Sequence, residues 1–375
     1  MSMKRYPAIP GHIGGMSMVE LMVAMTIGSF LMWGAITVYS RSRTTYQVSE
    51  QVARLQENAR YAVSVIEPDI RLANYWGLMN DPSVVTGAAT SVMAASPLSG
   101  STTPCGTNFA LNLGEIIRGD NNAFTLGPAR TAACNPYNSS DAVGGTAQPG
   151  ADTITVRRVN TQAAAATNTR LQLYVTRWGG SSQVFNNGTA PGALGPNAEI
   201  HDIIVDTYYI DADSVGRVGI PALRRKSLIN GPDWFDQEVI SGVEDLQVQF
   251  GIDLGRDANN DGTADDTDGN GLPDSYTGVV SQWVNPNAVP ATALIVSVRF
   301  WLLVRSETPE MGFVDNNTYV YGDRLAANGF TSILDAAGAG KAYRPGTPAT
   351  AAAANYRRML VSRTIQLRNT MSIGP

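Results

Sequence analysis

Residues 14–39, GGMSMVELMVAMTIGSFLMWGAITVY, form an apolar stretch that holds a single charged side chain, Glu20. From Leu21 to Tyr39 there are nineteen consecutive uncharged residues. As an α-helix rising about 1.5 Å per residue, they would span the hydrocarbon core of a bilayer, which is about 30 Å thick. The sequence therefore predicts one membrane-spanning helix near the N-terminus, with a carboxylate at its edge.

A removable secretory signal peptide over residues 1–39 is the alternative interpretation, because Lys4 and Arg5 precede the apolar run. The run is longer than the roughly 7–15 apolar residues of a signal peptide. No small-x-small cleavage pattern follows it, since VYSRSRTTYQ leads directly into a helical pattern. We therefore expect the apolar helix to remain in the mature protein.

The helical pattern continues beyond the membrane-length segment. Apolar residues recur at alternating spacings of four and three, which is one stripe of an amphipathic helix, at Val48, Val52, Leu55, Ala59, Ala62 and Ile66. We predict one helix over about residues 17–66, half in lipid and half against a soluble domain. Pro68 lacks a backbone donor and is expected to kink or end it, although DIRLANYW can add a turn. A coiled coil competes with this interpretation, but the stripe covers fewer than three heptads.

Composition narrows the class of protein. The chain has 375 residues, enough for one large domain or two small ones, and only 16% are charged. Its high content of Gly, Ser, Thr, Asn and Ala suits an extracytoplasmic β-rich protein with long loops. No basic patch indicates a nucleic-acid partner. His201 is the only histidine after His12, which leaves little material for a Ser-His-Asp triad or a histidine-rich zinc site.

Four segments after residue 150 alternate apolar and polar residues, which predicts strands with one buried face in an antiparallel sheet. The segments are TRLQLYVT (169–176), EDLQVQFGID (244–253), LIVSVRFWLLV (294–304) and MLVSRTIQL (359–367). Residues 77–150 are expected to be irregular. The predicted fold class is α+β, with a long N-terminal α-helix packed on antiparallel β-sheet and joined by long loops.

The residues around Glu20 resemble the processing motif of type IV prepilins: a glycine, a hydrophobic residue, small or apolar residues, and then a glutamate. Here these are Gly15, Met16, Ser17, Met18, Val19 and Glu20. In that family a prepilin peptidase cuts after the glycine, methylates the new N-terminus and leaves the helix in place. The resemblance implies a leader peptide over residues 1–15 and a mature N-terminus at Met16, where phenylalanine is commonest in the family.

A carboxylate in hydrocarbon costs about 2.5–3.5 kcal/mol on insertion scales and is tolerated where it meets a partner. The resemblance implies that the partner of Glu20 is the positive N-terminus of a neighbouring subunit, so that the charge is neutralised only on assembly. The alternative is that Glu20 lies near the end of the membrane segment and reaches the interface.

Further segments resemble the PilW family of type IV pilus minor pilins. They are VELMVAMTIGSFLM (19–32), VISGVEDLQVQFGID (239–253) followed by an Asp-rich loop, VSVRFWLLVRSETPE (296–310) and RRMLVSRTIQLRNTM (357–371). The similarity covers the N-terminal quarter and most of residues 236–370, whereas the middle is not diagnostic.

This resemblance implies a pilin-like structural subunit rather than an enzyme. Residues 16–40 would form the membrane and assembly half of the helix, residues 41–72 its amphipathic half, and residues 73–375 a periplasmic β-rich head. The subunit would wait in the inner membrane of a Gram-negative bacterium and then join the pilus. Its implied partners are other minor pilins and the major pilin, contacted through the helix, together with the prepilin peptidase and the inner-membrane assembly platform.

Several functions remain open at this point. A minor pilin would prime pilus assembly, support twitching motility, and could lie at the tip in an adhesive role. A type II secretion minor pseudopilin of the J type has the same N-terminus and a β-rich head. A membrane-anchored calcium-dependent enzyme is a distant alternative, since no nucleophile-elbow, HExxH, P-loop or Rossmann pattern occurs.

Residues 253–274, DLGRDANNDGTADDTDGNGLPD, hold seven aspartates and one arginine, Arg256. Oxygen-bearing residues fall at positions 1, 3, 5, 7, 9 and 12 of an EF-hand-like loop, with Gly262 at the turn. They are Asp257, Asn259, Asp261, Thr263, Asp265 and Asp268. Aspartate at the last position and flanking strands make the loop more similar to dockerin or thrombospondin type 3 calcium loops.

A second, overlapping half-site could share Asp268 and add Asp266, Asn270 and Asp274, with Gly271 at its turn. The alternative is a solvated loop in which Asp and Gly only make turns. Because seven like charges repel unless they are neutralised, we predict that calcium is bound. Magnesium suits the loop less well, because it prefers fewer protein ligands and a stricter octahedron.

Cys105 and Cys134 are the only cysteines, and export would place them in a compartment that permits disulfides. We predict a bridge that closes a loop of about thirty residues, worth roughly 3–4 kcal/mol in the chain-entropy model. Two unpaired thiols are the alternative, and a metal site built on two cysteines without histidine neighbours is less favoured.

The first testable prediction is cleavage after Gly15. Mass spectrometry of the protein extracted from membranes should find Met16 at the N-terminus, carrying one added methyl group. Cleavage after Tyr39 instead would contradict the resemblance to prepilins, because the apolar helix would then be lost.

Overall fold

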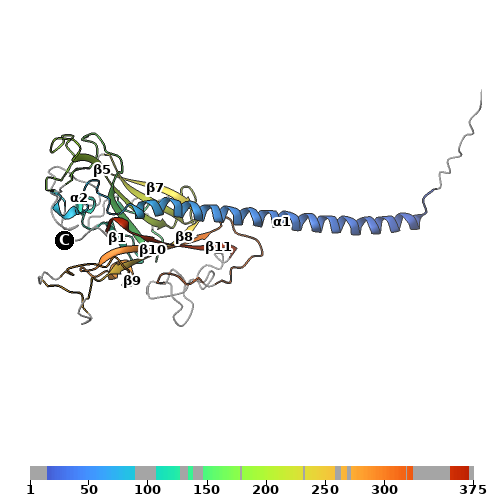
Figure 1. Ribbon diagram of the computed structural model, residues 1–375. Helices are drawn as coiled ribbons and strands as arrows, with labels where there is room; N and C mark the ends of the chain where they lie inside the picture. Colours follow the sequence, from blue (N-terminus) through green and yellow to red (C-terminus); the bar gives the residue numbers. More distant parts are fainter. Residues whose placement is uncertain are drawn as a thin grey trace, which may run out of the picture. The chain divides into compact units, whose positions relative to one another are not determined.

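A computed structural model describes residues 15–88, 107–126, 134–137, 147–177, 180–230, 233–257, 263–267, 272–317, 319–323 and 355–370. The chain divides into two compact units, residues 1–53 and residues 54–375, which we describe separately. Figure 1 shows the long helix in blue and the β-strands from green to red.

Helix α1 runs from Met18 to Arg71, with the acidic Glu20 in its first turn and the basic Arg71 in its last. This charge arrangement complements the helix dipole. Pro68 lies inside the last turn and removes the bond that its missing N–H would give to the Ser64 carbonyl. Both residues are exposed, so water can satisfy that carbonyl, and the helix continues for three residues beyond the proline.

The first sheet of residues 54–375 has seven strands in the order β1-β2-β5-β3-β4, with β6 paired to β5 and β7 to β6. All of these pairs are antiparallel. The strands are β1 Ile117–Asp120, β2 Thr153–Val159, β3 Gln172–Thr176, β4 Gln183–Phe185, β5 Ala198–Asp211, β6 Ala222–Ile229 and β7 Asp233–Ser241.

The second sheet is also antiparallel and has the order β11-β10-β8-β9. Three of the four predicted alternating segments form its long strands, and the fourth forms β3 in the first sheet. The strands are β8 Val243–Asp253, β9 Gln282–Val284, β10 Leu294–Arg305 and β11 Arg358–Gln366. Short helices complete the described elements: η1 Pro82–Val84, α2 Thr107–Leu111, η3 Pro286–Ala288 and η5 Arg368–Thr370.

The C-terminal part of α1 shares one hydrophobic core with both sheets. The helix contributes Leu55, Ala59, Ala62 and Ile66, as the stripe predicts, and these pack with residues such as Val156 of β2 and Phe250 of β8. A second core on the other side of the first sheet includes Trp76, Phe109 and Trp234. The α+β prediction of a helix on antiparallel sheet is confirmed.

The prediction that residues 77–150 are irregular is wrong at α2 and β1. Both elements are too short, at five and four residues, to show a periodicity. Strands β6 and β7 were also not predicted, because charged side chains occupy buried positions and no alternation of apolar and polar residues is visible in the sequence. Arg224 is 2% exposed and its Nε donates to Asp236 at 2.8 Å, while Lys226 donates to the same carboxylate at 2.8 Å.

A buried polar cluster joins the end of α1 to the first sheet. The Arg158 guanidinium on β2 donates to Asp69 of the helix at 2.6 Å, and the Tyr208 hydroxyl on β5 donates to the other oxygen of the same carboxylate. Asp206 lies on the same strand and accepts a hydrogen bond from Ser227 of β6. The hydrogen bonds of Asp69 fix the helix against two adjacent strands.

The second testable prediction follows from Asp206. Burial, together with the negative charge of Asp69, raises the pKa of Asp206 to about 6, against the opposing effects of Ser227, Arg225 and Arg158. A carboxyl with a raised folded-state pKa contributes stability that is present below the unfolded pKa and is lost as pH rises through about 6. Wild type should therefore gain more stability than Asp206→Asn on going from pH 7.5 to 5, by about 1.4 kcal/mol per pH unit below 6.

Thermal unfolding at the two pH values would measure this difference. The amide keeps the shape of the side chain and an acceptor for Ser227, but it does not titrate. Titrating groups that do not interact with Asp206, such as Asp211 whose pKa burial raises to about 7, are common to both proteins and cancel in the comparison. Equal pH responses of the two proteins would contradict the prediction.

Candidate functional site

The side chains of Ser17 and Glu20 both cap backbone N–H groups at the start of α1. Its carboxylate Oε2 accepts a hydrogen bond from the Ser17 backbone N–H at 3.0 Å. The Ser17 hydroxyl accepts one in turn from the Val19 backbone N–H at 3.3 Å. The Glu20 contact is one half of a capping box, whereas the Ser17 hydroxyl accepts from the second helical residue, Val19, instead of from Glu20.

The cap gives Glu20 a partner within its own chain. The first N–H groups of a helix have no acceptor in the helix itself, and a negative charge there also complements the dipole. The pattern Ser17-x-x-Glu20 is visible in the sequence, but our sequence interpretation considered only the charge. The predicted contact of Glu20 with a neighbouring subunit is not tested by a single chain and stays a prediction.

The N-terminal half of α1 presents large apolar side chains to solvent. Among the described residues, this helix is long and apolar enough to cross a membrane, by length and composition alone. Phe30, Leu31 and Trp33 are each about 70% exposed. Leaving so much contiguous apolar surface in water is unfavourable, so this surface suits lipid or the apolar surface of another protein segment.

Asp253 closes the base of the Asp-rich loop. It is fully buried at the end of β8. Its Oδ1 accepts from the Gly255 N–H at 2.9 Å, and its Oδ2 accepts from the Thr277 hydroxyl at 2.9 Å and the Gly278 N–H at 2.6 Å. One carboxylate therefore holds together the entry and the exit of the loop.

Backbone hydrogen bonds also connect the described parts of the Asp-rich loop to one another. The Arg256 N–H donates to the Ser275 carbonyl at 2.9 Å, the Asp265 N–H to the Arg256 carbonyl at 2.8 Å, and the Asp274 N–H to the Asp265 carbonyl at 2.8 Å. Asp274 Oδ2 also accepts from the Thr267 N–H and hydroxyl at 3.0 and 2.6 Å. Asp265 and Asp274, one from each predicted half-site, thus come together.

The structure describes five of the nine predicted calcium ligands: Asp257, Thr263, Asp265, Asp266 and Asp274. The other four, Asn259, Asp261, Asp268 and Asn270, lie outside the described residues. Within the described residues, no group of three or more His, Cys, Asp or Glu side chains is placed to hold a metal ion. The carboxylate and carbonyl oxygens suit calcium chemically, and calcium binding stays a prediction.

The remaining predicted residues have separate positions. Cys134 is buried in the second core, whereas Cys105 lies outside the described residues, so the disulfide stays a prediction. His201 is buried on β5, with Nδ1 2.8 Å from the Asn160 carbonyl oxygen and Nε2 3.0 Å from Glu199 Oε2. These contacts give the histidine a structural role between β5 and a neighbouring loop.

Comparisons with known proteins agree with the N-terminal motif and the second sheet. Residues 207–369 match the family described as Type IV Pilus-assembly protein W, PilW, and residues 12–36 match the prokaryotic N-terminal methylation motif. Among solved structures, the type IV-like pilin TTHA1219 from Thermus thermophilus is similar at 16% identity with a TM-score of 0.25, over 60% of this chain and 80% of that chain. A search of curated proteins finds no match.

The third testable prediction concerns calcium. An ion that binds the folded loop and not the unfolded chain stabilises by about 2.7 kcal/mol at a hundredfold excess over Kd. With a Kd of about 10⁻⁴ to 10⁻³ M, the purified chain should melt several degrees higher in millimolar calcium than in chelator, and magnesium should give less. Replacing Asp257 and Asp261 by alanine removes two proposed ligands and should abolish this shift.

The double variant should also be slightly more stable than wild type in chelator, because repulsion among the aspartates is relieved. Glu57→Ala, at an exposed carboxylate on α1, is the control and should keep the full calcium shift. An equal shift in the double variant would place the site elsewhere, and no shift in wild type would leave the loop as a solvated turn.

Proposed function

The chain belongs to the PilW family of type IV pilins, and from this premise we propose that it is a minor pilin that primes pilus assembly. In this role it is cleaved after Gly15, stays in the inner membrane through α1, and joins other minor pilins in a complex on which the pilus grows. The head is periplasmic before assembly and reaches the cell surface afterwards, where it can cap the tip.

The observation that carries the proposal is the cap at the start of α1. A helix that spans lipid can keep a carboxylate at its first turn only where hydrogen-bond donors or a cation are close. Ser17 provides the donor within the chain, and cleavage after Gly15 would create an amino group one residue before it. The charge of Glu20 is then available to a neighbouring subunit without destabilising the free subunit.

The proposed partners follow from the surfaces of the two units. The exposed apolar side chains of residues 16–39 suit the helices of the major pilin and of other minor pilins, as well as the lipid that precedes them. The Asp-rich loop, if it binds calcium, would stabilise the head in the calcium-containing space outside the cell. Prepilin peptidase and the inner-membrane assembly platform complete the proposed set.

The fourth testable prediction separates the charge of Glu20 from its cap. Glu20→Gln retains a side-chain oxygen that can accept from Ser17, but it removes the charge. Ser17→Ala retains the charge but removes the hydroxyl half of the cap. We expect both variants to insert and to be cleaved, Ser17→Ala to support surface pili, and Glu20→Gln to reduce pili at least tenfold.

These variants would be expressed in a strain that lacks the gene, with surface pili, twitching and protein secretion scored together. Normal pili with Glu20→Gln would show that the charge is not required and would overturn the proposed assembly contact. Loss of secretion with pili intact in the deletion strain would instead assign the chain to a type II secretion pseudopilus.

A further inference from the structure

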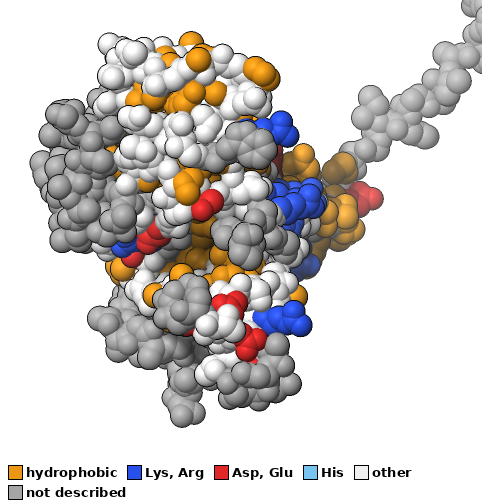
Figure 2. All heavy atoms as spheres, turned by 60° about the vertical axis from the view of Figure 1, so that its left-hand side comes forward, with side chains coloured by type: hydrophobic (Ala, Val, Ile, Leu, Met, Phe, Trp, Pro, Cys, Tyr) orange, Lys and Arg blue, Asp and Glu red, His pale blue; other side chains and the backbone are white. Residues whose placement is uncertain are grey.

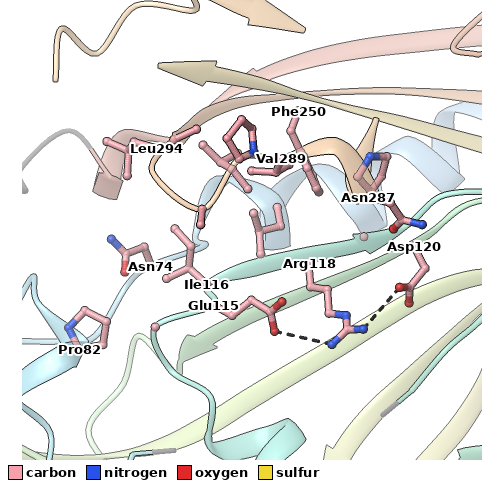
Figure 3. A pocket seen from close by; sticks show the side chains of 18 of the residues that line it. Asn74, Pro82, Glu115, Ile116, Arg118, Asp120, Phe250, Asn287, Val289 and Leu294 are labelled. Atoms are coloured by element: carbon pink, nitrogen blue, oxygen red, sulfur yellow. Dashed lines mark hydrogen bonds and ion pairs between the residues drawn. The ribbon is translucent and has the colours of Figure 1, made fainter. Parts of the chain in front are cut away.

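A cavity of about 610 Å³ lies at the edge of the first sheet, where β1 faces the second sheet. Its walls come from β1 and the residues before it, from β8, and from the segment that leads through η3 to the start of β10 (Figure 3). All of these elements belong to residues 54–375, and none of the residues predicted from sequence as functional lines the cavity. Its size is within the range of sites that hold small molecules or peptide segments.

Strand β1 has a free edge that borders this cavity. It pairs with β2 on one side, and among the described strands none pairs with it on the other. The Arg157 N–H donates to the Ile116 carbonyl at 2.9 Å, and the register places Ile117 opposite Val156. In an antiparallel ladder the bonding direction alternates, so the N–H and C=O groups of Ile117 and Gly119 point away from β2.

Both of these residues line the cavity, but Ile117 is only 3% exposed and Pro286 of η3 packs on Gly119, so their outer backbone groups can be reached only from within the cavity. Within the described part of the chain, no backbone hydrogen bond joins them to η3 or to the residues that follow it. An edge strand with open N–H and C=O groups is a template for another strand. The open edge and the cavity beside it together form a slot for an extended backbone.

The walls of the slot offer apolar contacts for side chains. Besides alanines and prolines, the larger apolar side chains that line it come from β1, β8, β10 and the segments next to them: Ile116, Ile117, Phe250, Val289, Leu294 and Ile295. Figure 3 shows Val289, Leu294 and Phe250 on one side and Arg118 with its two carboxylate neighbours on the other. On the face drawn in Figure 2, the Lys and Arg side chains gather mainly at the right, and the few Asp and Glu side chains are separated by apolar and uncharged ones.

The charges at the slot are predominantly negative. Asp81, Glu115 and Asp120 line it with Arg118 as the one basic lining residue. Arg118 is 3.9 Å from Glu115 and 3.5 Å from Asp120, which are long ion-pair distances. Burial raises the pKa of the Asp120 carboxyl against the opposing effect of Arg118, so a further cation would stabilise its charged form.

We propose that this slot receives an extended segment of another protein, which adds to β1 as a further strand. The segment pairs with the open groups of Ile117 and Gly119, places alternate apolar side chains against Phe250 and Leu294, and carries Lys or Arg beside them to meet the carboxylates. Strand addition of this kind takes its affinity from backbone hydrogen bonds and its selectivity from alternate side chains. The inference does not depend on the proposed role in pilus assembly.

The test uses the full chain in lipid nanodiscs and a labelled peptide, Lys-Val-Thr-Val-Thr-Val-Lys, with blocked ends. Hydrogen exchange at the amides of Ile117 and Gly119 should slow at least tenfold at saturating peptide. Exchanging both lysines of the peptide for glutamate should weaken binding at least tenfold. The peptide would also be N-methylated either at the central valine or at a neighbouring threonine. Only one of these two N–H groups faces β1, so one methyl group should weaken binding and the other should leave it unchanged.

Two alanine-to-tryptophan variants, one that obstructs the slot and one that does not, provide matched proteins for the test. Ala291→Trp places an indole at the exposed rim of the cavity and should weaken the peptide at least tenfold. Ala163→Trp makes the same change at an exposed alanine that does not line the cavity, and it should leave binding unchanged.

Four results would overturn the proposal: no protection of the two amides at millimolar peptide, equal binding of the glutamate peptide, equal effects of the two N-methyl groups, or equal binding by Ala291→Trp. Protection that rises with protein concentration in the absence of peptide would assign the edge to a second copy of this chain instead.

Discussion

The packing of one helical stripe between two sheets is the contact on which the rest of residues 54–375 depends. Ala59 and Ala62 are fully buried in the core that α1 shares with β2, β5, β8 and β10. A side chain no larger than a methyl group lets the helix approach both sheets closely, and a larger one at either position would push them apart. The C-terminal part of the helix is therefore an integral part of the fold.

The spacing of apolar residues predicted those helices and strands that bury a single face. The stripe from Leu55 to Ile66 and the alternation in β8 and β10 each reflect a single buried face, and both were identified from sequence. Strand β5 pairs with β2, β3 and β6 along its length and is buried on both faces, so it shows no clean alternation. The β6–β7 pair is held by buried ion pairs, which a hydrophobic pattern cannot reveal.

The candidate sites likewise include some that a local sequence motif predicts and one that only the tertiary structure reveals. Gly15 and Glu20 belong to one short motif, and the family matches support it. The capping role of Ser17 was also present in the sequence, because a Ser-x-x-Glu pattern at a helix start has a known geometry. The slot beside β1 could not have been predicted, since it joins residues near 117 to residues near 290 through the packing of two sheets.

The hydrogen bonds of Asp69 have a mechanical consequence. They connect the end of α1 to Arg158 on β2 and Tyr208 on β5, which are interior strands bonded on both sides. A tensile load carried along the helix would enter the sheet at strands whose hydrogen bonds to their neighbours must break together, whereas an edge strand could be peeled away one bond at a time. Resistance to forced unfolding is set by the rate of such cooperative rupture, so this attachment favours a head that stays folded while it is pulled.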